Sequence, residues 1–150
     1  MKVNLLTNDP KGVRPGWVNI DASGGPGAIL GSVVDLGHSV DLGEAEEIYS
    51  SDVLDKLPLE QGKAALQNWL ACLRFGGTLT VAVLDLREAC RLVLDGALTP
   101  EGANQTIFSR RSAWPVAYLA QQITERGGRV VSKSLEGMRA VVVAERVDPR

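Results

Sequence analysis

Acidic and hydroxyl side chains come at or near the ends of short apolar runs in the first part of the sequence. Asp21, Asp35 and Ser50 hold such positions, and Ser51 and Asp52 follow directly after Ser50. Carboxylates accept hydrogen bonds from hydroxyl and amino groups, so these acids suit a ligand with a ribose diol and an exocyclic amine. Any one of these acids alone would serve equally well to cap a loop. Their shared placement predicts one small-molecule site.

No side chain stands out as a catalytic acid, base or nucleophile. His38 is the only histidine, and its Gly-His-Ser-Val setting indicates a surface or capping role. Cys72 and Cys90 lie among apolar residues of helix-like segments, which favours buried free thiols over a disulfide or a metal site. Tyr49 and Trp114 would suit an acceptor pocket, although core packing is the more ordinary role of both. We therefore predict no metal site and name no catalytic residue.

The spacing of apolar residues predicts the elements that position these side chains. Helical spacing is found in residues 59–73, 86–94 and 112–126, the last with Ser112 as its cap, and residues 97–111 are predicted to form a loop over the pocket mouth. Strands are predicted for residues 3–6, 17–21, 33–36, 47–50, 78–84, 129–135 and 139–145.

This order of elements predicts a single α/β domain over residues 1–150. A chain of 150 residues with 45% hydrophobic residues supplies one core. Strand–helix alternation around the run 78–84, which is hydrophobic at nearly every position, is typical of a doubly wound, mostly parallel sheet, with few helices in the N-terminal half. The last two strands are close enough to form an antiparallel hairpin at one edge. In such sheets ligands bind outside the carboxyl ends of the strands.

The connection between the first two predicted strands is too short for a crossover helix. Residues 7–16 contain Pro10, Gly12, Pro15 and Gly16, and parallel strands usually need a crossover of about a dozen residues or more. One face of the sheet is therefore expected to be thinly covered near the first three strands. We predict that a second copy of the chain closes this face as a homodimer, because bare apolar sheet surface rarely stays exposed.

Charge gives little reason to expect a polyanionic partner. The formal net charge is -2 and the isoelectric point is near 5.4, so nucleic acid is not expected as a ligand. Acids gather in residues 35–60 and bases in residues 110–150, which indicates two solvated faces or, alternatively, a basic docking surface for an acidic substrate. No run is long and apolar enough for a signal peptide or membrane span, so we expect a cytoplasmic protein.

Four segments together resemble the class I S-adenosylmethionine-dependent methyltransferases. They are VNLL at 3–6, PGWVNID at 15–21, EIYSSDVLDKLP at 47–58 and LRFGGTL at 73–79. The likeness is greatest to small predicted methyltransferases that join the first two strands through a Pro-Gly-Trp connection. It implies a Rossmann-like sheet of seven strands, and S-adenosylmethionine as the cofactor.

The resemblance also implies roles for individual residues. Asp21 matches the acid that binds the ribose hydroxyls, and Asp35 with Leu36 matches the segment that meets the adenine. Asn8 matches a position of the glycine-rich loop after the first strand. The segment near the methionine moiety is matched by Ser50, Ser51, Asp52 and Leu54.

The first loop departs from the family pattern. Leu6-Thr7-Asn8 stands where the family has Gly-x-Gly. Asn8 tolerates the left-handed backbone region, whereas the Leu6 side chain obstructs a close approach of the cofactor. The sequence thus predicts methyl transfer from S-adenosylmethionine, and the alternative is a non-catalytic methyltransferase-like binding or regulatory subunit. A nicotinamide-dependent oxidoreductase would need Gly-x-Gly-x-x-Gly between strand and helix, which is missing here.

Overall fold

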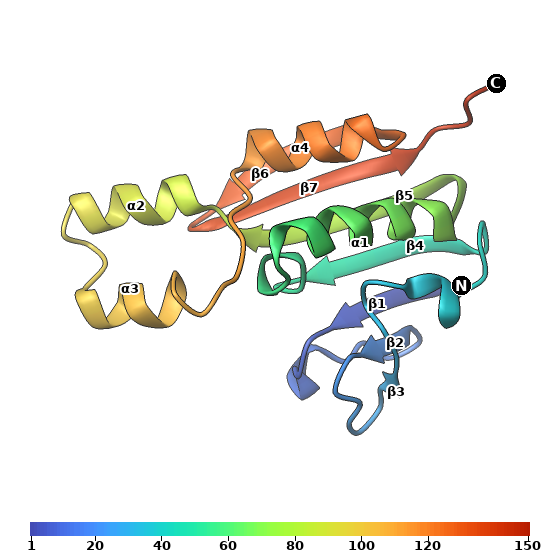
Figure 1. Ribbon diagram of the computed structural model, residues 1–150, viewed down its shortest axis with the longest axis horizontal. Helices are drawn as coiled ribbons and strands as arrows, with labels where there is room; N and C mark the ends of the chain where they lie inside the picture. Colours follow the sequence, from blue (N-terminus) through green and yellow to red (C-terminus); the bar gives the residue numbers. More distant parts are fainter.

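A seven-stranded mixed sheet forms the centre of the molecule, which a computed structural model describes over residues 1–150. The strands are β1 (Lys2–Leu6), β2 (Val18–Asp21), β3 (Ile29–Leu30), β4 (Ala45–Ser51), β5 (Leu73–Leu84), β6 (Gly128–Glu136) and β7 (Arg139–Arg146). Their order is β3-β2-β1-β4-β5-β7-β6 (Figure 1). β1 to β5 are parallel, and β7 pairs antiparallel with both β5 and β6. The chain winds outward from β1 in both directions, so the predicted sheet and its terminal hairpin are confirmed.

All four α-helices follow the first four strands in the sequence. They are α1 (Leu59–Cys72), α2 (Leu86–Leu94), α3 (Pro100–Thr106) and α4 (Val116–Glu125). The N-terminal half holds only the short 3-10 turns η1 (Pro10–Gly12), η2 (Leu36–His38) and η3 (Leu54–Lys56) before α1 begins. The expected shortage of helix in this half is confirmed. None of the helices is long and apolar enough to cross a membrane.

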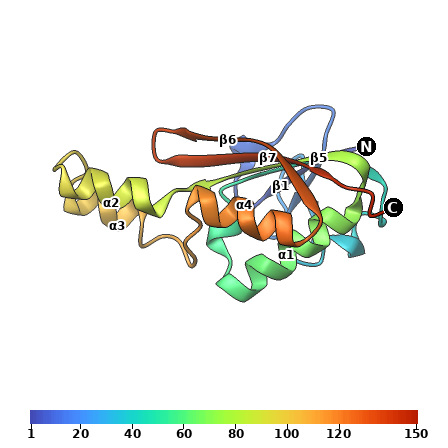
Figure 2. The same ribbon diagram turned by 90° about the horizontal axis from the view of Figure 1, so that it is seen from above.

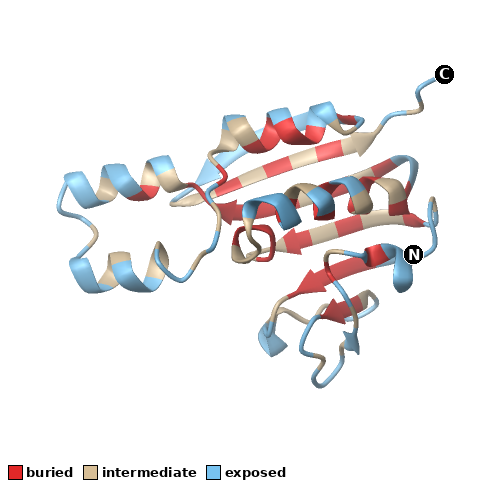
Figure 3. Cartoon of the chain, in the orientation of Figure 1, coloured by how far each residue is buried: buried red, intermediate tan, exposed pale blue.

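The hydrophobic core lies between the sheet and one helical layer formed by α1 and α4. Alternate residues of the strands face this layer, as the alternating burial along β4 and β7 shows (Figure 3). Trp69 of α1 is completely buried, and its Nε1 donates a hydrogen bond to the Val33 carbonyl oxygen at 2.7 Å. Trp114 is also completely buried, as predicted, and packs against Tyr118.

The predicted third strand is wrong. Residues 33–35 form a bend that leads into η2, which begins at Leu36, and the third strand is instead the exposed pair Ile29–Leu30. Val33 and Leu36 are buried because they pack in the core beneath α1. The apolar run therefore reflects packing against a helix, which residue type alone does not distinguish from pairing in a sheet.

Two further boundaries differ from the predictions. The region 97–111 contains α3, which Thr99 caps by accepting a hydrogen bond from the Gly102 backbone N–H. The helix predicted from Ser112 begins at Val116, because the Ser112 hydroxyl accepts from Trp114 Nε1 at 2.7 Å instead of capping a helix.

The two cysteines differ in their surroundings. Cys72 is buried, as predicted, and burial is the main reason that the pKa of its thiol is raised; Asp41 adds to this and Arg146 opposes it. Cys90 is exposed on α2, so the prediction that it is buried is wrong. α2 and α3 project beyond the end of the sheet (Figures 1 and 2), and this leaves much of α2 open to solvent.

The other face of the sheet carries no α-helix, as Figure 2 shows. The β1–β2 connection covers β1 and β2 on this face, where Asn4 Nδ2 donates to Gly12 O and the Arg14 N–H donates to Asn19 Oδ1. The face lacks an α-helix, as predicted, but near β1 and β2 this connection covers it, since Asn4 is only 1% and Asn19 only 6% exposed. The side chains on it are mostly polar, among them Asn4, Tyr49, Ser51, Thr78 and Thr80. The apolar surface on which the dimer prediction depended is largely missing there.

Candidate functional site

The carboxyl ends of β1, β2 and β4 meet at one edge of the sheet, and Asp21 joins the loops that leave two of them. Leu6 is paired with Asp21 across β1 and β2, and Leu5 is paired with Ser50 across β1 and β4. Asp21 Oδ1 accepts hydrogen bonds from the N–H groups of Asn8 at 2.9 Å and Ser23 at 2.8 Å. Its Oδ2 accepts from the Asp9 N–H at 3.2 Å. Asp21 is only 2% exposed, so it holds the two loops together from inside.

Asp21 is a stabilised anion. Burial favours its protonated form and would raise its pKa. The backbone N–H groups of Asn8, Ser23 and Asp9, helped by the charge of Lys56, outweigh this and lower the pKa below its ordinary value of 3.8. Asp21 therefore carries a negative charge at neutral pH.

Asn8 adopts the left-handed backbone conformation that glycine would otherwise supply. Its φ is 51°, and the only other non-glycine residue with positive φ is Asp52, at 57°. The expectation that Asn8 tolerates this region is confirmed. The first loop thus makes a left-handed turn without the family's glycine.

The strain at Asn8 can be measured by substitution. Asn8→Ala is expected to lower the free energy of unfolding by about 1 kcal/mol. In the left-handed conformation the Cβ lies too close to the following carbonyl oxygen, and alanine has no polar side chain to compensate by local hydrogen bonding. Asn8→Gly is expected to stay within about 0.5 kcal/mol of the parent, because glycine adopts positive φ readily. Urea denaturation of both variants provides the measurement. Equal stability of the two would contradict the left-handed assignment.

Two hydroxyl groups at neighbouring strand ends have no hydrogen-bond partner. Ser50 is completely buried, and both its Oγ and Thr7 Oγ1 are buried atoms without a partner. Buried hydroxyls are normally hydrogen-bonded, so these two are available to a polar ligand or to water. Thr7 is not among the predicted site residues, although a threonine directly after an apolar strand is a usable signal.

The remaining predicted site residues occupy different surroundings. Ser51 Oγ accepts a hydrogen bond from Arg139, and Asp52 forms an ion pair with Arg110 at 3.5 Å. Leu36 and Leu54 are completely buried members of the core. Asp35 is exposed and precedes η2, whose Gly37 N–H donates to Asn68 of α1. Asp35 therefore precedes a turn that contacts α1, and its carboxylate forms no ion pair or hydrogen bond with the loops held by Asp21.

A buried ion pair that the sequence did not reveal lies beside this edge. Asp55 is completely buried, and its Oδ2 accepts from the Leu84 N–H at 3.0 Å and from Arg110 Nε at 3.2 Å. Arg110 also bonds to Asp52, so it connects two acids that follow β4. This cluster anchors the chain between α3 and α4 against the carboxyl ends of β4 and β5.

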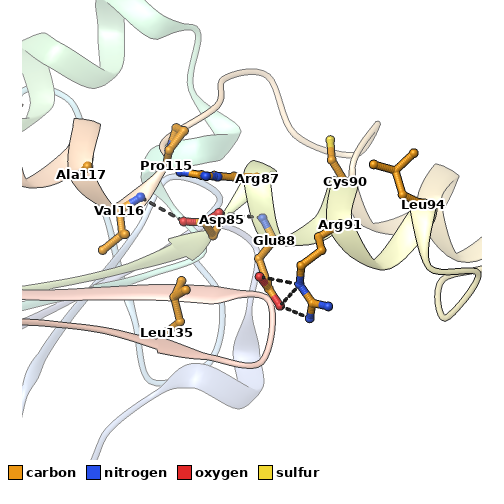
Figure 4. Close-up of a pocket in the computed structure, with 10 residues that line it drawn as sticks. All are labelled: Asp85, Arg87, Glu88, Cys90, Arg91, Leu94, Pro115, Val116, Ala117 and Leu135. Atoms are coloured by element: carbon orange, nitrogen blue, oxygen red, sulfur yellow. Dashed lines mark hydrogen bonds and ion pairs between the residues drawn. The ribbon is translucent and has the colours of Figure 1, made fainter.

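The largest cavity lies away from the predicted site. It measures about 580 Å³ and opens between α2, the start of α4 and β6 (Figure 4). Asp85 stands at its inner end, with Oδ1 accepting from the Glu88 N–H and Oδ2 from the Val116 N–H. Both oxygens thus serve the starts of α2 and α4, and Asp21 does not line this cavity.

The residues at the strand ends fit an adenosyl ligand in part. The left-handed turn at Asn8 and the free hydroxyls of Thr7 and Ser50 suit a polar ligand at the β1 and β4 ends. Asp21 does not fit as a ribose acceptor in the arrangement described, because the residue is only 2% exposed and its carboxylate faces three backbone N–H groups of the adjoining loops. A ribose contact would require the 7–9 loop to move.

Comparison with known proteins supports the fold. No protein-family model and no curated protein matches the sequence. Among solved structures, the chain is similar to a SAM-dependent methyltransferase from Archaeoglobus fulgidus, with 9% identity, TM-score 0.66 and coverage of 96% of this chain and 86% of that one. It is also similar to the 1,6-didemethyltoxoflavin N1-methyltransferase of Burkholderia thailandensis with bound S-adenosylhomocysteine, with 13% identity, TM-score 0.67 and coverage of 97% and 71%.

A third similar structure is much longer than this chain. It is an O-methyltransferase family protein from Burkholderia thailandensis, with 10% identity, TM-score 0.67 and coverage of 99% of this chain but 52% of that one. The chain therefore spans about half the length of that protein. At these identities the likeness shows the fold, which is the Rossmann-like fold of class I methyltransferases.

Proposed function

We propose that this chain, which has the class I methyltransferase fold, binds S-adenosylmethionine at the carboxyl ends of β1, β2 and β4 and supports methyl transfer to an acceptor. The observation that carries the proposal is the pair of unpartnered hydroxyls of Thr7 and Ser50 at the β1 and β4 ends, beside a left-handed turn at Asn8. The cofactor would supply a methyl group activated on its sulfonium. The protein would mainly align the acceptor, which accounts for the lack of an evident general base.

The cofactor contacts are proposed residue by residue. Asn8 and Asp21 would lie beside the ribose once the 7–9 loop shifts, and Ser50 would offer its free hydroxyl to the methionine end. Ser51, Asp52, Asp35, Leu36 and Leu54 come from the family likeness; of these, Leu36 and Leu54 are enclosed in the core.

A second candidate is a non-catalytic binding or regulatory subunit with the same fold. It is favoured by the burial of Asp21, whose carboxylate accepts hydrogen bonds from three backbone N–H groups, and by the burial of Leu6, only 3% exposed, where the family has glycine. In that case Asp21 and the two loops that it connects would have only a structural role and would bind no cofactor.

Calorimetric titration with S-adenosylmethionine and S-adenosylhomocysteine distinguishes the two candidates. The proposed function predicts saturable heats with both compounds and a raised Tm, because a ligand that binds only the folded state stabilises it. Asp148→Ala is a suitable control, since Asp148 contacts only the exposed Arg150. Absence of both heat and thermal shift at millimolar ligand would favour the non-catalytic subunit.

The homodimer and the cytoplasmic location remain predictions from the sequence. The mostly polar character of the helix-free face removes the apolar argument for the dimer, so the proposed function does not depend on it. Sedimentation at micromolar concentration tests the dimer, and a monomer would contradict it.

A further inference from the structure

A polar hollow lies on the helix-free face of the sheet, between the β1–β2 connection and β4. Its volume is about 290 Å³, close to the lower end of the roughly 300–1,000 Å³ typical of small-molecule sites. The side chains that give it its character are those of Asn4, Asp9, Lys11, Arg14, Tyr49 and Ser51. Neither Asp21 nor Ser50 lines it, so it adjoins the proposed cofactor site without coinciding with it, and shares with it only Ser51 and Asp9 of the 7–9 loop.

Three basic side chains gather at this hollow without an acidic partner. Lys11 and Arg14 line it, and Arg139 reaches its rim by donating to Ser51 Oγ. None of the three belongs to an ion pair of the protein, and Asp9 is the only acid in the lining. Like charges around one hollow repel one another, and an anion between them offsets that repulsion. The positive charge of these three side chains is confined to this hollow, since the chain as a whole has a net charge of -2.

The guanidinium groups of Arg14 and Arg139 are positioned as expected for a binding site. The Arg14 guanidinium lies 3.5 Å from the centre of the Tyr49 ring and 4.9 Å from that of Trp17, so aromatic contacts on two residues hold it in place. Arg139 Nε is a buried donor without a partner. A planar guanidinium held in this way suits two-point recognition of phosphate oxygens.

The backbone beside the hollow is fixed by buried amides. Asn4 is 1% exposed, and its Nδ2 donates to Gly12 O at 2.8 Å and to Asn19 Oδ1 at 2.8 Å. Asn19 in turn accepts from the Arg14 N–H and donates to the Arg14 carbonyl oxygen. These bonds hold the segment that carries Lys11 and Arg14 against the sheet.

We propose that this hollow binds a small phosphate-bearing molecule, with Arg14, Lys11 and Arg139 around the phosphate and Ser51 beside it. The volume leaves room for a compact organic group as well as the phosphate. This site does not rest on the proposed cofactor function, and the molecule need not be a methyl acceptor.

Calorimetry with glycerol 3-phosphate and inorganic phosphate tests the site, with sodium chloride at matched ionic strength as the reference. Both phosphate compounds are expected to bind saturably, and Lys11→Gln is expected to weaken binding about three- to tenfold, the effect of losing one charge-assisted contact at a partly exposed site. Arg14→Lys keeps the positive charge but loses the planar guanidinium and its paired N–H donors, so it should also weaken binding. Lys133→Gln is the matched control, because Lys133 is exposed on β6 and forms no ion pair.

Two outcomes would overturn the proposal. One is that phosphate gives no more heat or thermal stabilisation than chloride at the same ionic strength. The other is that Lys11→Gln and Lys133→Gln weaken phosphate binding equally, which would mean diffuse attraction by surface charge. Melting curves of each variant without ligand show whether it remains folded. Because S-adenosylhomocysteine is titrated separately, failure at either site is recognised independently.

Discussion

Replacing Asp55 by Ala is expected to lower the free energy of unfolding by about 2–4 kcal/mol, close to the cost of breaking a buried ion pair by removing one partner. Asp55 is completely buried, and its Oδ2 accepts from both the Leu84 N–H and Arg110 Nε. The substitution would leave the Leu84 N–H without an acceptor inside the protein. Arg110, whose side chain is 19% exposed, would keep its ion pair with Asp52 and its hydrogen bond to Thr106 O, which explains why the expected loss lies below the extreme for fully buried charges.

Urea denaturation at neutral pH provides this measurement. Asp148→Ala removes an acid from the exposed pair with Arg150 and is expected to change stability by less than about 0.5 kcal/mol. A double-mutant cycle with Arg110→Met separates the ion pair from the bond to Leu84, since only the latter survives in the Arg110 variant. A loss in Asp55→Ala no larger than in Asp148→Ala would show that the buried pair does not form.

Most strands were predictable because burial on one or both faces imposes a regular pattern. The run 78–84, hydrophobic at nearly every position, predicts a buried strand, and β5 includes all of it. The third strand was not recognisable, since Ile29–Leu30 is an exposed two-residue edge strand in a glycine-rich loop. Its predicted substitute, 33–36, owes its apolar residues to contacts with α1, such as the bond from Trp69 to Val33. The sequence carries no sign of which partner buries a short apolar run.

The position of the candidate site was more predictable than its contacts. Asp21 lies at the end of β2 as expected, because a strand end is a local property of the sequence. Its partners are backbone N–H groups of the two adjoining loops, and such donors occur in every residue type except proline. The ion pair of Asp55 with Arg110 joins residues 55 positions apart, so only the tertiary fold brings them together.

Asp21→Ala is expected to lower the free energy of unfolding by about 2–4 kcal/mol at pH 7, because hydrogen bonds to a charged group contribute about 1.5–3 kcal/mol and water reaches part of the freed loop. Three backbone N–H groups lose their acceptor in this variant. The pKa of Asp21 is lowered on folding, so its contribution is fully present above the ordinary value of 3.8 and is lost as the pH falls through the folded-state pKa. The stability difference between parent and variant should therefore shrink in acid. A difference independent of pH would contradict the conclusion that ionised Asp21 holds the two loops together.

The same variant shows whether Asp21 also serves the cofactor. Asn8→Ala disturbs the same loop through its backbone but keeps the carboxylate, so it is the matched control for S-adenosylhomocysteine binding. If Asp21 accepts the ribose hydroxyls, Asp21→Ala should weaken binding by about 1–3 kcal/mol beyond the effect of Asn8→Ala, the cost of an unpaired polar group. If the two variants lose affinity equally, Asp21 acts only by shaping the loop. Unchanged affinity of Asp21→Ala for S-adenosylhomocysteine would place the ribose elsewhere. The carboxylate would then neither contact the ligand nor hold the loop in a conformation that binding requires.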